Sequence, residues 1–396
     1  METTVDPAAF PVHMRGMSKL LSPYSIKSVT LKNRVAVAPM CQYSSVDGMA
    51  DDWHFAHLAR FAIGGFGLVI VEATSVTEEG RITYGDLGFW NDDQIAPLKR
   101  IVAFLHSQGT AAGIQLAHAG RKASSLIPWR NGVPEREDEK AAVGYADWVP
   151  VAPSAVRHTA EPSIYKVPHA LSVAELGAIR DAFVASARRA DAAGFDLVEV
   201  HAAHGYLLNQ FLSPVANKRD DAYGGSLANR MRFPLEVVEA VRAVWPQTKA
   251  LAVRLSVQDA IEGGWTVEDS IVLCRELKTL GVDIIDCSSG GFEGARVKPE
   301  PNYQAPLAKA VRDGAGIPTM AVGLINDAHE AEAIITSGDA DMVALARTAL
   351  DDPQWPLNAA RTLGAVDEAY SFWPKQAGYA VKIRDRVLKR GPFQST

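Results

Sequence analysis

The sequence has little of what marks a secreted, membrane-spanning or nucleic-acid-binding protein. Its 396 residues include only three cysteines, Cys41, Cys274 and Cys287, which are too few and too widely spaced for a disulfide framework or an iron–sulfur set. No apolar run approaches the roughly 18 residues of a membrane span, and residues 1–16 lack a hydrophobic signal core. Lys and Arg total 40 and Asp and Glu total 46, a net charge of −6 that disfavours a nucleic-acid surface. We therefore expect a soluble enzyme of the reducing cytoplasm with no membrane or nucleic-acid partner.

A glycine-rich dinucleotide turn is also missing. Gly64–Gly67 precedes a predicted strand rather than a helix, and the first predicted strand runs into Ala38–Tyr43 without such a turn. Both observations argue against an open, doubly wound sheet.

The chain has instead eight short apolar segments that are typical of buried strands. They are Val35–Met40, Leu68–Glu72, Ala111–Leu116, Asp196–His201, Ala250–Ser256, Asp283–Cys287, Thr319–Val322 and Met342–Ala346. Helical patterns separate these segments, most clearly at Asp93–Ser107, Val173–Ala193, Leu227–Val244, Val267–Leu280 and Ala328–Ser337. Strand–helix alternation repeated eight times predicts an α/β fold of the (β/α)8 or TIM-barrel type.

A single barrel domain, residues 19–360, accounts for this alternation. Residues 1–18 are predicted as a loose leader and residues 361–396 as a C-terminal tail, and alternating residues at Tyr24–Asn33 predict an N-terminal hairpin. The connection at about 122–170, after the third strand, is rich in Pro, Trp and charge and is unusually long. Because it leaves the carboxyl end of a strand, we predict a lid over the barrel mouth; a decorative insertion is the alternative.

His201, His204 and Tyr206 follow the fourth predicted strand, at the end of a barrel where chemistry gathers. A single helical turn would put both imidazoles on one side. Two imidazole donors could hold a carbonyl or nitro oxygen while charge develops on it, and the phenol could supply a proton. A second interpretation is a metal site made by Glu199, His201 and His204, as in a metal-dependent hydrolase or lyase.

Other strand ends carry side chains that a packing core does not need. Arg254 lies in an apolar strand and requires either a core carboxylate or a ligand that becomes anionic, such as a reduced isoalloxazine ring. Gln115 matches the donors and acceptors of a flavin's pyrimidine edge. Gly323 and Arg347 follow the seventh and eighth strands, where barrels often bind phosphate. Together these residues outline a flat ligand with a phosphate tail, which is FMN.

With its motifs, the chain resembles the old yellow enzyme family. The motifs are Ala38–Tyr43, Gly113–Arg121, His201–Leu207 and Arg219–Ser226, and the resemblance runs from about residue 20 to about residue 353. Cys41 and the paired histidines are similar to those of the bacterial subgroup of thermophilic-like ene-reductases and xenobiotic reductases. Relatives with an iron–sulfur cluster need a run of cysteines that this chain lacks.

The resemblance implies an NAD(P)H dehydrogenase with non-covalent FMN and with no metal. NADPH or NADH would pass hydride to FMN, and FMN would pass it to the β-carbon of an α,β-unsaturated carbonyl or nitro compound in a ping-pong reaction, followed by protonation of the α-carbon. The implied cofactor-binding residues are Ala38, Pro39, Met40, Cys41, Ala73, Gln115, Arg254, Gly323, Ala346 and Arg347.

The resemblance also assigns the reacting groups. His201 and His204 would bind the electron-withdrawing group of the alkene, Tyr206 would donate the proton, and Tyr43 would flank the substrate. Cys41 would lie near the reactive nitrogen of the flavin and tune its potential.

A homo-oligomer, dimer or tetramer, is expected, because members of the subgroup lend a tail residue to a neighbouring pocket. Trp373 and Arg384 are the candidates for that part here.

Overall fold

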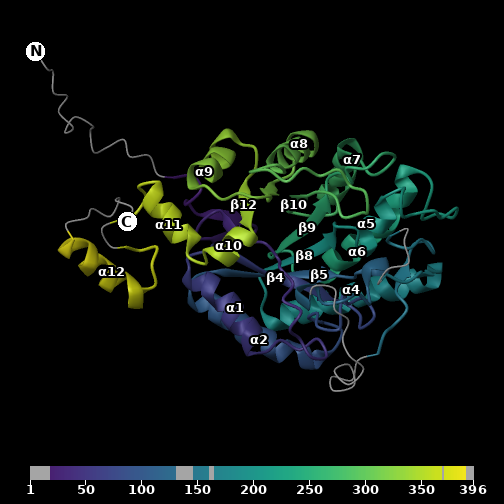
Figure 1. Ribbon diagram of the computed structural model, residues 1–396, viewed down its shortest axis with the longest axis horizontal. Coiled ribbons are helices and arrows are strands. Elements are labelled where there is room, and N and C mark those ends of the chain that lie inside the picture. Colours follow the sequence, from purple (N-terminus) through teal and green to yellow (C-terminus); the bar gives the residue numbers. More distant parts are fainter. Residues whose placement is uncertain (1–17, 131–145, 160–164, 368–369, 389–396) are drawn as a thin grey trace, which may run out of the picture.

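Eight parallel strands close into a barrel, which confirms the predicted (β/α)8 architecture (Figure 1). The computed structural model describes residues 18–130, 146–159, 165–367 and 370–388. The predicted leader, except for residue 18, and parts of the predicted lid and tail lie outside the described residues. The barrel strands are β3 (Val35–Val37), β4 (Leu68–Ser75), β5 (Ala111–Ala117), β8 (Leu197–Ala202), β9 (Ala250–Ser256), β10 (Ile284–Ser288), β11 (Thr319–Ala321) and β12 (Met342–Leu345).

Helices cover the outside of the barrel (Figure 1). They are α1 (Asp52–Ile63), α2 (Ile95–Ser107), α4 (Val173–Ala193), α5 (Leu207–Leu212), α6 (Leu227–Val244), α7 (Val267–Thr279), α8 (Ala305–Ala315), α9 (Ala328–Ser337), α10 (Arg347–Asp351) and α11 (Trp355–Thr362). The bounds of α4, α6 and α9 are those predicted, and Ser172 caps α4 through a reciprocal hydrogen-bond pair with Glu175. Helices α1 and α8 were not among the clear helical patterns of the sequence.

The inside of the barrel changes character along its axis. Side chains at the amino-terminal ends of the strands form an apolar cluster that includes Leu68, Ala111, Leu197, Ala250 and Ile284. Alternate residues of a strand share a face, so the next inward positions are Glu199 on β8 and Asp286 on β10. On β5 and β9 the polar residues Gln115 and Arg254 come four residues after Ala111 and Ala250. There the interior becomes polar, and this polar half is the wall of the candidate site.

The predicted N-terminal hairpin forms from β1 (Tyr24–Ile26) and β2 (Val29–Leu31), paired antiparallel. Ile26 and Leu31 belong to the same apolar cluster as the amino-terminal strand residues. The hairpin therefore plugs the amino-terminal end of the barrel, opposite to the end at which the predicted site residues gather.

The part of the long insertion that is described carries short elements only. They are η3 (Gly120–Lys122), η4 (Pro128–Arg130) and the two-residue strands β6 (Val151–Ala152) and β7 (His169–Ala170), which pair parallel. Outside the insertion, one 3-10 turn, η2 (Asp92–Gln94), precedes α2.

The described tail contains helix α12 (Lys375–Val387), which lies beyond α11 at the edge of the molecule (Figure 1). The two tail residues predicted to serve a neighbouring subunit have contacts within their own chain. The Arg361 guanidinium lies 4.9 Å from the ring centre of Trp373, and Arg384 pairs with Asp385 at 2.6 Å. Their role toward a neighbour stays a prediction.

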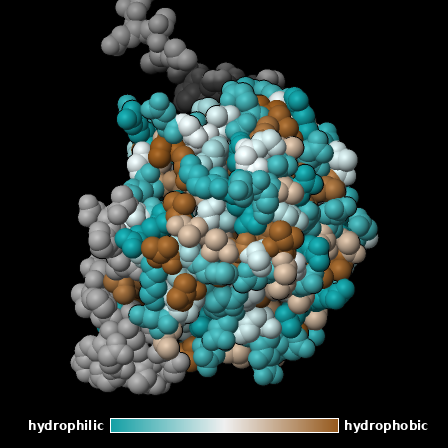
Figure 2. Space-filling model, turned by 90° about the vertical axis from the view of Figure 1, so that its right-hand side faces the viewer, coloured by the Kyte–Doolittle hydropathy of each residue, from teal (hydrophilic) through white to brown (hydrophobic). Residues whose placement is uncertain are grey.

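The surface seen in Figure 2 is mostly hydrophilic, with hydrophobic residues in small separate groups. Among the described residues, no helix combines the length and the apolar character that crossing a membrane requires.

Candidate active site

His201 and His204 lie where β8 ends and the chain turns toward α5. The helical turn expected between them does not form, because His204 has a φ of +59° and breaks the backbone into the left-handed region. This turn still brings the two rings together, edge to face, with centroids 5.3 Å apart. The Tyr206 ring lies 5.0 Å from the His201 ring. The structure therefore groups the three predicted reacting side chains, although by a different local geometry.

Both histidines are neutral in this environment. Burial, and then the positive charge of Arg254, lowers the pKa of His201 and of His204 well below the usual range. His201 Nδ1 accepts a hydrogen bond from the backbone N–H of Ala203 at 3.2 Å. Its single proton therefore sits on Nε2, so His201 can donate a hydrogen bond from that atom.

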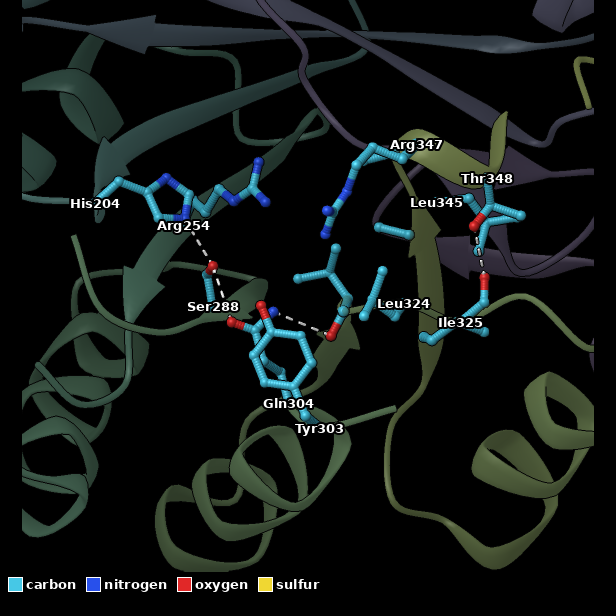
Figure 3. Close-up of a pocket in the computed structure, with 14 residues that line it drawn as sticks. His204, Arg254, Ser288, Tyr303, Gln304, Leu324, Ile325, Leu345, Arg347 and Thr348 are labelled. Carbon is cyan, nitrogen blue, oxygen red and sulfur yellow. Dashed lines mark hydrogen bonds between the residues drawn. The ribbon is translucent and has the colours of Figure 1, made fainter. Parts of the chain in front are cut away.

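His204 is held differently from His201. Its Nε2 lies 2.7 Å from the hydroxyl oxygen of Ser288, and that hydroxyl donates to Gln304 Oε1 at 3.3 Å (Figure 3). In this chain of hydrogen bonds, Nε2 of His204 is the donor to Ser288. Ser288 and Gln304 were not identified from the sequence, since nothing local marks a serine at the end of β10 as a partner of a histidine after β8.

Arg254 forms an ion pair with a carboxylate inside the barrel. A core carboxylate was one of the two partners expected for it. Its Nε lies 3.1 Å from Asp286 Oδ2, and the two residues are directly opposite in the pairing of β9 with β10. Neither atom has a well-directed hydrogen-bond partner among the described residues. The ion pair is therefore incomplete, and the guanidinium keeps capacity to bind a further acceptor.

A second buried carboxyl group lies on the other side of Arg254. Glu199 accepts a hydrogen bond from Gln115 Nε2 at 2.7 Å, which leaves the carbonyl oxygen of Gln115 as an acceptor. Burial, and then the nearby Asp286, raises the pKa of Glu199 to about 8. Burial likewise raises the pKa of Asp286 against the pull of Arg254. Two carboxyl groups share one guanidinium, so one proton is retained at neutral pH.

A cavity of about 170 Å³ opens between the carboxyl ends of β9 to β12. Its walls include four of the predicted cofactor residues: Arg254, Gly323, Ala346 and Arg347. The guanidinium groups of Arg254 and Arg347 both point into this space (Figure 3). Gly323 has a φ of +118°, and a Cβ there would come within 3.0 Å of Gln304 and Tyr303. The position therefore requires glycine, and the open backbone leaves room for a ligand.

The other predicted cofactor residues line different spaces. Ala38, which follows β3, and Met40 face a small void beside Glu72. Ala73 faces another small void together with Tyr206. Pro39 is half-buried between Ala38 and Met40 in the chain.

Cys41 and Tyr43 pack in one cluster with Tyr206. Burial is the largest cause that raises the pKa of the Cys41 thiol, the Tyr43 phenol and the Tyr206 phenol, so all three are protonated. Tyr206 thus has a proton to give.

The segment that carries Cys41 is held by a group that sequence reasoning noted only as a strand end. Glu72 occupies an irregularity in the pairing of β4 with β5, where the ladder skips a residue. Its carboxylate accepts the backbone N–H of Gln42 and lies 3.2 Å from His54 Nε2. A carboxylate at a strand end next to a predicted ligand loop is the signal that could have indicated this role.

The described part of the insertion reaches the same cluster. Trp148 packs against the group formed by Cys41, Tyr43 and Tyr206. From the other side, Lys122 Nζ donates to the carbonyl oxygen of His204 at 3.0 Å and lies 5.0 Å from the Tyr206 ring centre. The role of the insertion as a lid stays a prediction.

The metal interpretation of Glu199, His201 and His204 finds no support in the geometry. Over the described residues, no three His, Cys, Asp or Glu side chains are grouped as ligands for one ion. The Glu199 carboxylate is bound to Gln115, and His204 is bound to Ser288.

Comparisons with known proteins agree with the fold. A model of the NADH:flavin oxidoreductase / NADH oxidase family matches residues 19–365. An NADPH dehydrogenase of Geobacillus thermodenitrificans is 44% identical over 353 residues, which is 88% of this chain and 96% of the relative. An NADH:flavin oxidoreductase of Gibberella zeae is 45% identical over 340 residues, covering 82% of this chain and 81% of the relative.

Solved structures give the same picture. Morphinone reductase has a TM-score of 0.72 at 29% identity, covering 92% of this chain and 96% of its own. The old yellow enzyme homologue of Zymomonas mobilis has a TM-score of 0.69 at 29% identity, covering 85% and 91%. The chain belongs to the NADH:flavin oxidoreductase / NADH oxidase family and is an NAD(P)H:flavin oxidoreductase of the old yellow enzyme type.

Proposed function

We propose that this flavin oxidoreductase is an FMN-dependent ene-reductase that reduces α,β-unsaturated carbonyl or nitro compounds at the expense of NADPH or NADH. The observation that carries the proposal is the group formed by His201, His204 and Tyr206. A neutral imidazole with a free Nε2–H lies beside a protonated, buried phenol, at the open end of the barrel. This pairing suits a substrate that develops negative charge on an oxygen and then takes up a proton on carbon.

The donor set around the 170 Å³ cavity fits an anionic flavin with a phosphate tail. Arg254 has an incompletely paired guanidinium, and Gln115 has a free amide oxygen, so these two could hold the ring. Gly323, Ala346 and Arg347 would hold the phosphate. Ala38, Pro39, Met40, Cys41 and Ala73 would line the ring. Bound FMN would supply the hydride chemistry of both half-reactions.

The residues of the chain would do the rest. His201 would donate its Nε2–H to the carbonyl or nitro oxygen of the alkene. His204 would add a second donor by turning its Nε2–H from Ser288 to that oxygen when the substrate binds. Because both rings are neutral, they would stabilise the developing oxyanion without transferring a proton. Tyr206 would protonate the α-carbon. Tyr43 would flank the substrate on the side of Cys41. Each oxyanion donor is worth a factor of about 10²–10³ in rate.

The test is anaerobic titration of the purified protein. We expect a yellow protein that releases FMN on acid denaturation, is bleached by NADPH or NADH, and regains its colour on adding an activated alkene such as 2-cyclohexenone. The double variant His201→Ala with His204→Ala should keep FMN and its reduction by the nicotinamide, but lose alkene reduction at least about 10³-fold.

His106→Ala is the matched control. His106 lies on α2, is exposed, and pairs with Asp196 far from the mouth. Wild-type rates of alkene reduction in the double variant would overturn the proposed role of the pair. A protein that holds FMN and oxidises NADPH but leaves every alkene unchanged would overturn ene-reduction itself.

A further inference from the structure

A second and larger cavity, which no step of the proposed reaction uses, adjoins the candidate site. It measures about 370 Å³ and lies between the described part of the insertion and the loops that follow β9 and β10. Its lining includes the apolar side chains of Val215, Ile261 and Phe292 and the nitrogen-bearing side chains of Arg121, Arg157 and His158. The Arg121 guanidinium lies 5.2 Å from the centre of the Phe292 ring, so charged and apolar groups meet in this space. We name this space the annex.

Three nitrogen atoms in the lining of the annex have no hydrogen-bond partner in the part of the chain that the structure describes. Arg121 is 4% exposed, and its Nη1 donates to the carbonyl oxygens of Val156 and Arg157 at 3.3 and 3.1 Å. Arg121 Nε, Arg157 Nε and His158 Nδ1 are buried and have no hydrogen-bond partner among the described residues. The two arginine Nε atoms are donors, whereas burial lowers the pKa of His158 to about 3, so its neutral ring adds no charge. Unpaired buried donors are costly, and they indicate a site whose partner comes from outside the chain.

Charge in the annex favours an anion. Burial lowers the pKa of Arg121 to about 10, so its guanidinium remains positive at neutral pH. Within the described chain no carboxylate lies within ion-pair distance of Arg121 or Arg157. Glu293 lines the annex, but it is exposed at the rim and has an interaction of its own. A carboxylate or a phosphate would therefore find two guanidinium groups that are free to pair with it.

The annex lies close to the proposed reacting groups in the fold. Lys122 follows Arg121 directly, and its Nζ contacts the carbonyl oxygen of His204. The His158 ring packs edge-on against Tyr165, with centroids 4.6 Å apart. Lys122 Nζ also lies 5.0 Å from the centre of the Tyr206 ring. A molecule whose reacting end lies at Tyr206 can therefore reach the annex with its other end.

We propose that the annex binds the anionic group of a reactant whose reacting end lies at His201 and Tyr206. The inference rests on the proposed function and adds the class of reactant that this site selects. Val215, Ile261 and Phe292 would pack against the hydrocarbon or ring next to the anion, and Arg121 and Arg157 would pair with the charge. The anion has two sources: a carboxylate on the alkene, or the 2′-phosphate that distinguishes NADPH from NADH.

The experiment measures kcat/KM of the flavin-loaded enzyme for two pairs of reactants. The first pair is an unsaturated ketone that carries a carboxylate and its methyl ester; the second is NADPH and NADH. The variant is Arg157→Gln, and the control is Arg188→Gln on the exposed face of α4. Loss of a charge-assisted pair should lower kcat/KM about tenfold or more for the anionic member of a pair and less than about twofold for its partner.

The two arms separate the two sources. A selective loss for the carboxylated ketone assigns the annex to the alkene, and a selective loss for NADPH assigns it to the nucleotide. If Arg157→Gln changed kcat/KM equally for both members of both pairs, the proposal would be overturned, and the annex would be a water-filled space. If neither alkene is turned over by the wild type, ene-reduction has failed, while the NADPH and NADH arm still tests the annex.

A wild-type measurement covers the case in which Arg157→Gln does not fold. Inorganic pyrophosphate should compete with the anionic member of the responding pair and not with its neutral or less charged partner. Inhibition that is the same for both members would count against an anion site.

Discussion

The two halves of the barrel interior are made by the same strands and differ in what they do. In the amino-terminal half, Leu197, Ala250 and Ile284 pack against each other and against the hairpin. Two residues further along, the same strands present Glu199, Ala252 and Asp286, and Arg254 follows on β9. The first half is a conventional apolar core. The second half buries two carboxyl groups and one guanidinium, an arrangement that costs stability and creates binding capacity. A (β/α)8 barrel can thus separate stability from chemistry along its axis.

Arg254→Leu is the substitution with the largest expected effect on this division. It leaves Asp286 buried beside an apolar side chain, so the free energy of unfolding should fall by about 3–5 kcal/mol. Urea unfolding of the flavin-free protein measures this loss, and flavin binding should weaken in parallel. Adding Asp286→Leu should restore most of the stability but not the flavin affinity. If Arg254→Leu alone were as stable as the wild type, Arg254 would not be needed to compensate the buried carboxyl groups of the polar half.

Leu197→Ala probes the apolar half. The side chain is 2% exposed, and its removal leaves a cavity that should cost about 3 kcal/mol of unfolding free energy. The affinity for flavin should stay within about twofold of the wild type, because the change lies below the polar half. A large loss of flavin affinity at unchanged stability would show that the two halves are not separate.

Glu199→Gln should remove a pH dependence of stability. Because burial raises the pKa of Glu199 from its usual 4.5 to about 8, the folded protein keeps a proton that the unfolded chain loses in this range. The stability from this proton is fully present below about pH 4.5 and is lost as the pH rises toward about 8. The Tm of the wild type should therefore fall across this window more steeply than the Tm of the variant. Parallel Tm curves would place the retained proton elsewhere.

Ser288→Ala has the smallest expected effect. It removes the acceptor that fixes the His204 ring but leaves the polar half otherwise intact. A single neutral hydrogen bond contributes about 0.5–1.5 kcal/mol, so the KM for the alkene should rise about two- to tenfold while flavin content stays constant. Steady-state kinetics with 2-cyclohexenone measures the change. An unchanged KM would mean that His204 does not need this support.

The architecture could be predicted from the sequence because it depends on local patterns. Eight short apolar segments that alternate with helical patterns locate the eight barrel strands, and the Ser172 cap and a following glycine locate both ends of α4. Helix α8 was not predicted, although small apolar residues, Ala305, Ala308, Val311 and Ala315, form its buried face. The largest differences in strand bounds lie at β3, which ends three residues before its predicted end, and at β4, which runs three residues beyond it.

Only those site residues could be predicted whose role is visible from the sequence of one strand end alone. Arg254 was recognisable because a guanidinium inside an apolar strand always requires a partner, but its two expected partners could not be separated. Asp286 decides this through its register opposite Arg254, which is a property of the paired strands and not of either segment. Ser288 and the left-handed turn at His204 escaped for the same reason, since both depend on residues distant in the sequence.

The hairpin covers the amino-terminal end of the barrel, so the polar half is left facing the opposite end. In the proposed reaction, the compound that supplies electrons and the compound that receives them would share that entrance in turn. Each reactant in excess should then obstruct the other, and the spent nicotinamide would have to depart before the second reactant could enter.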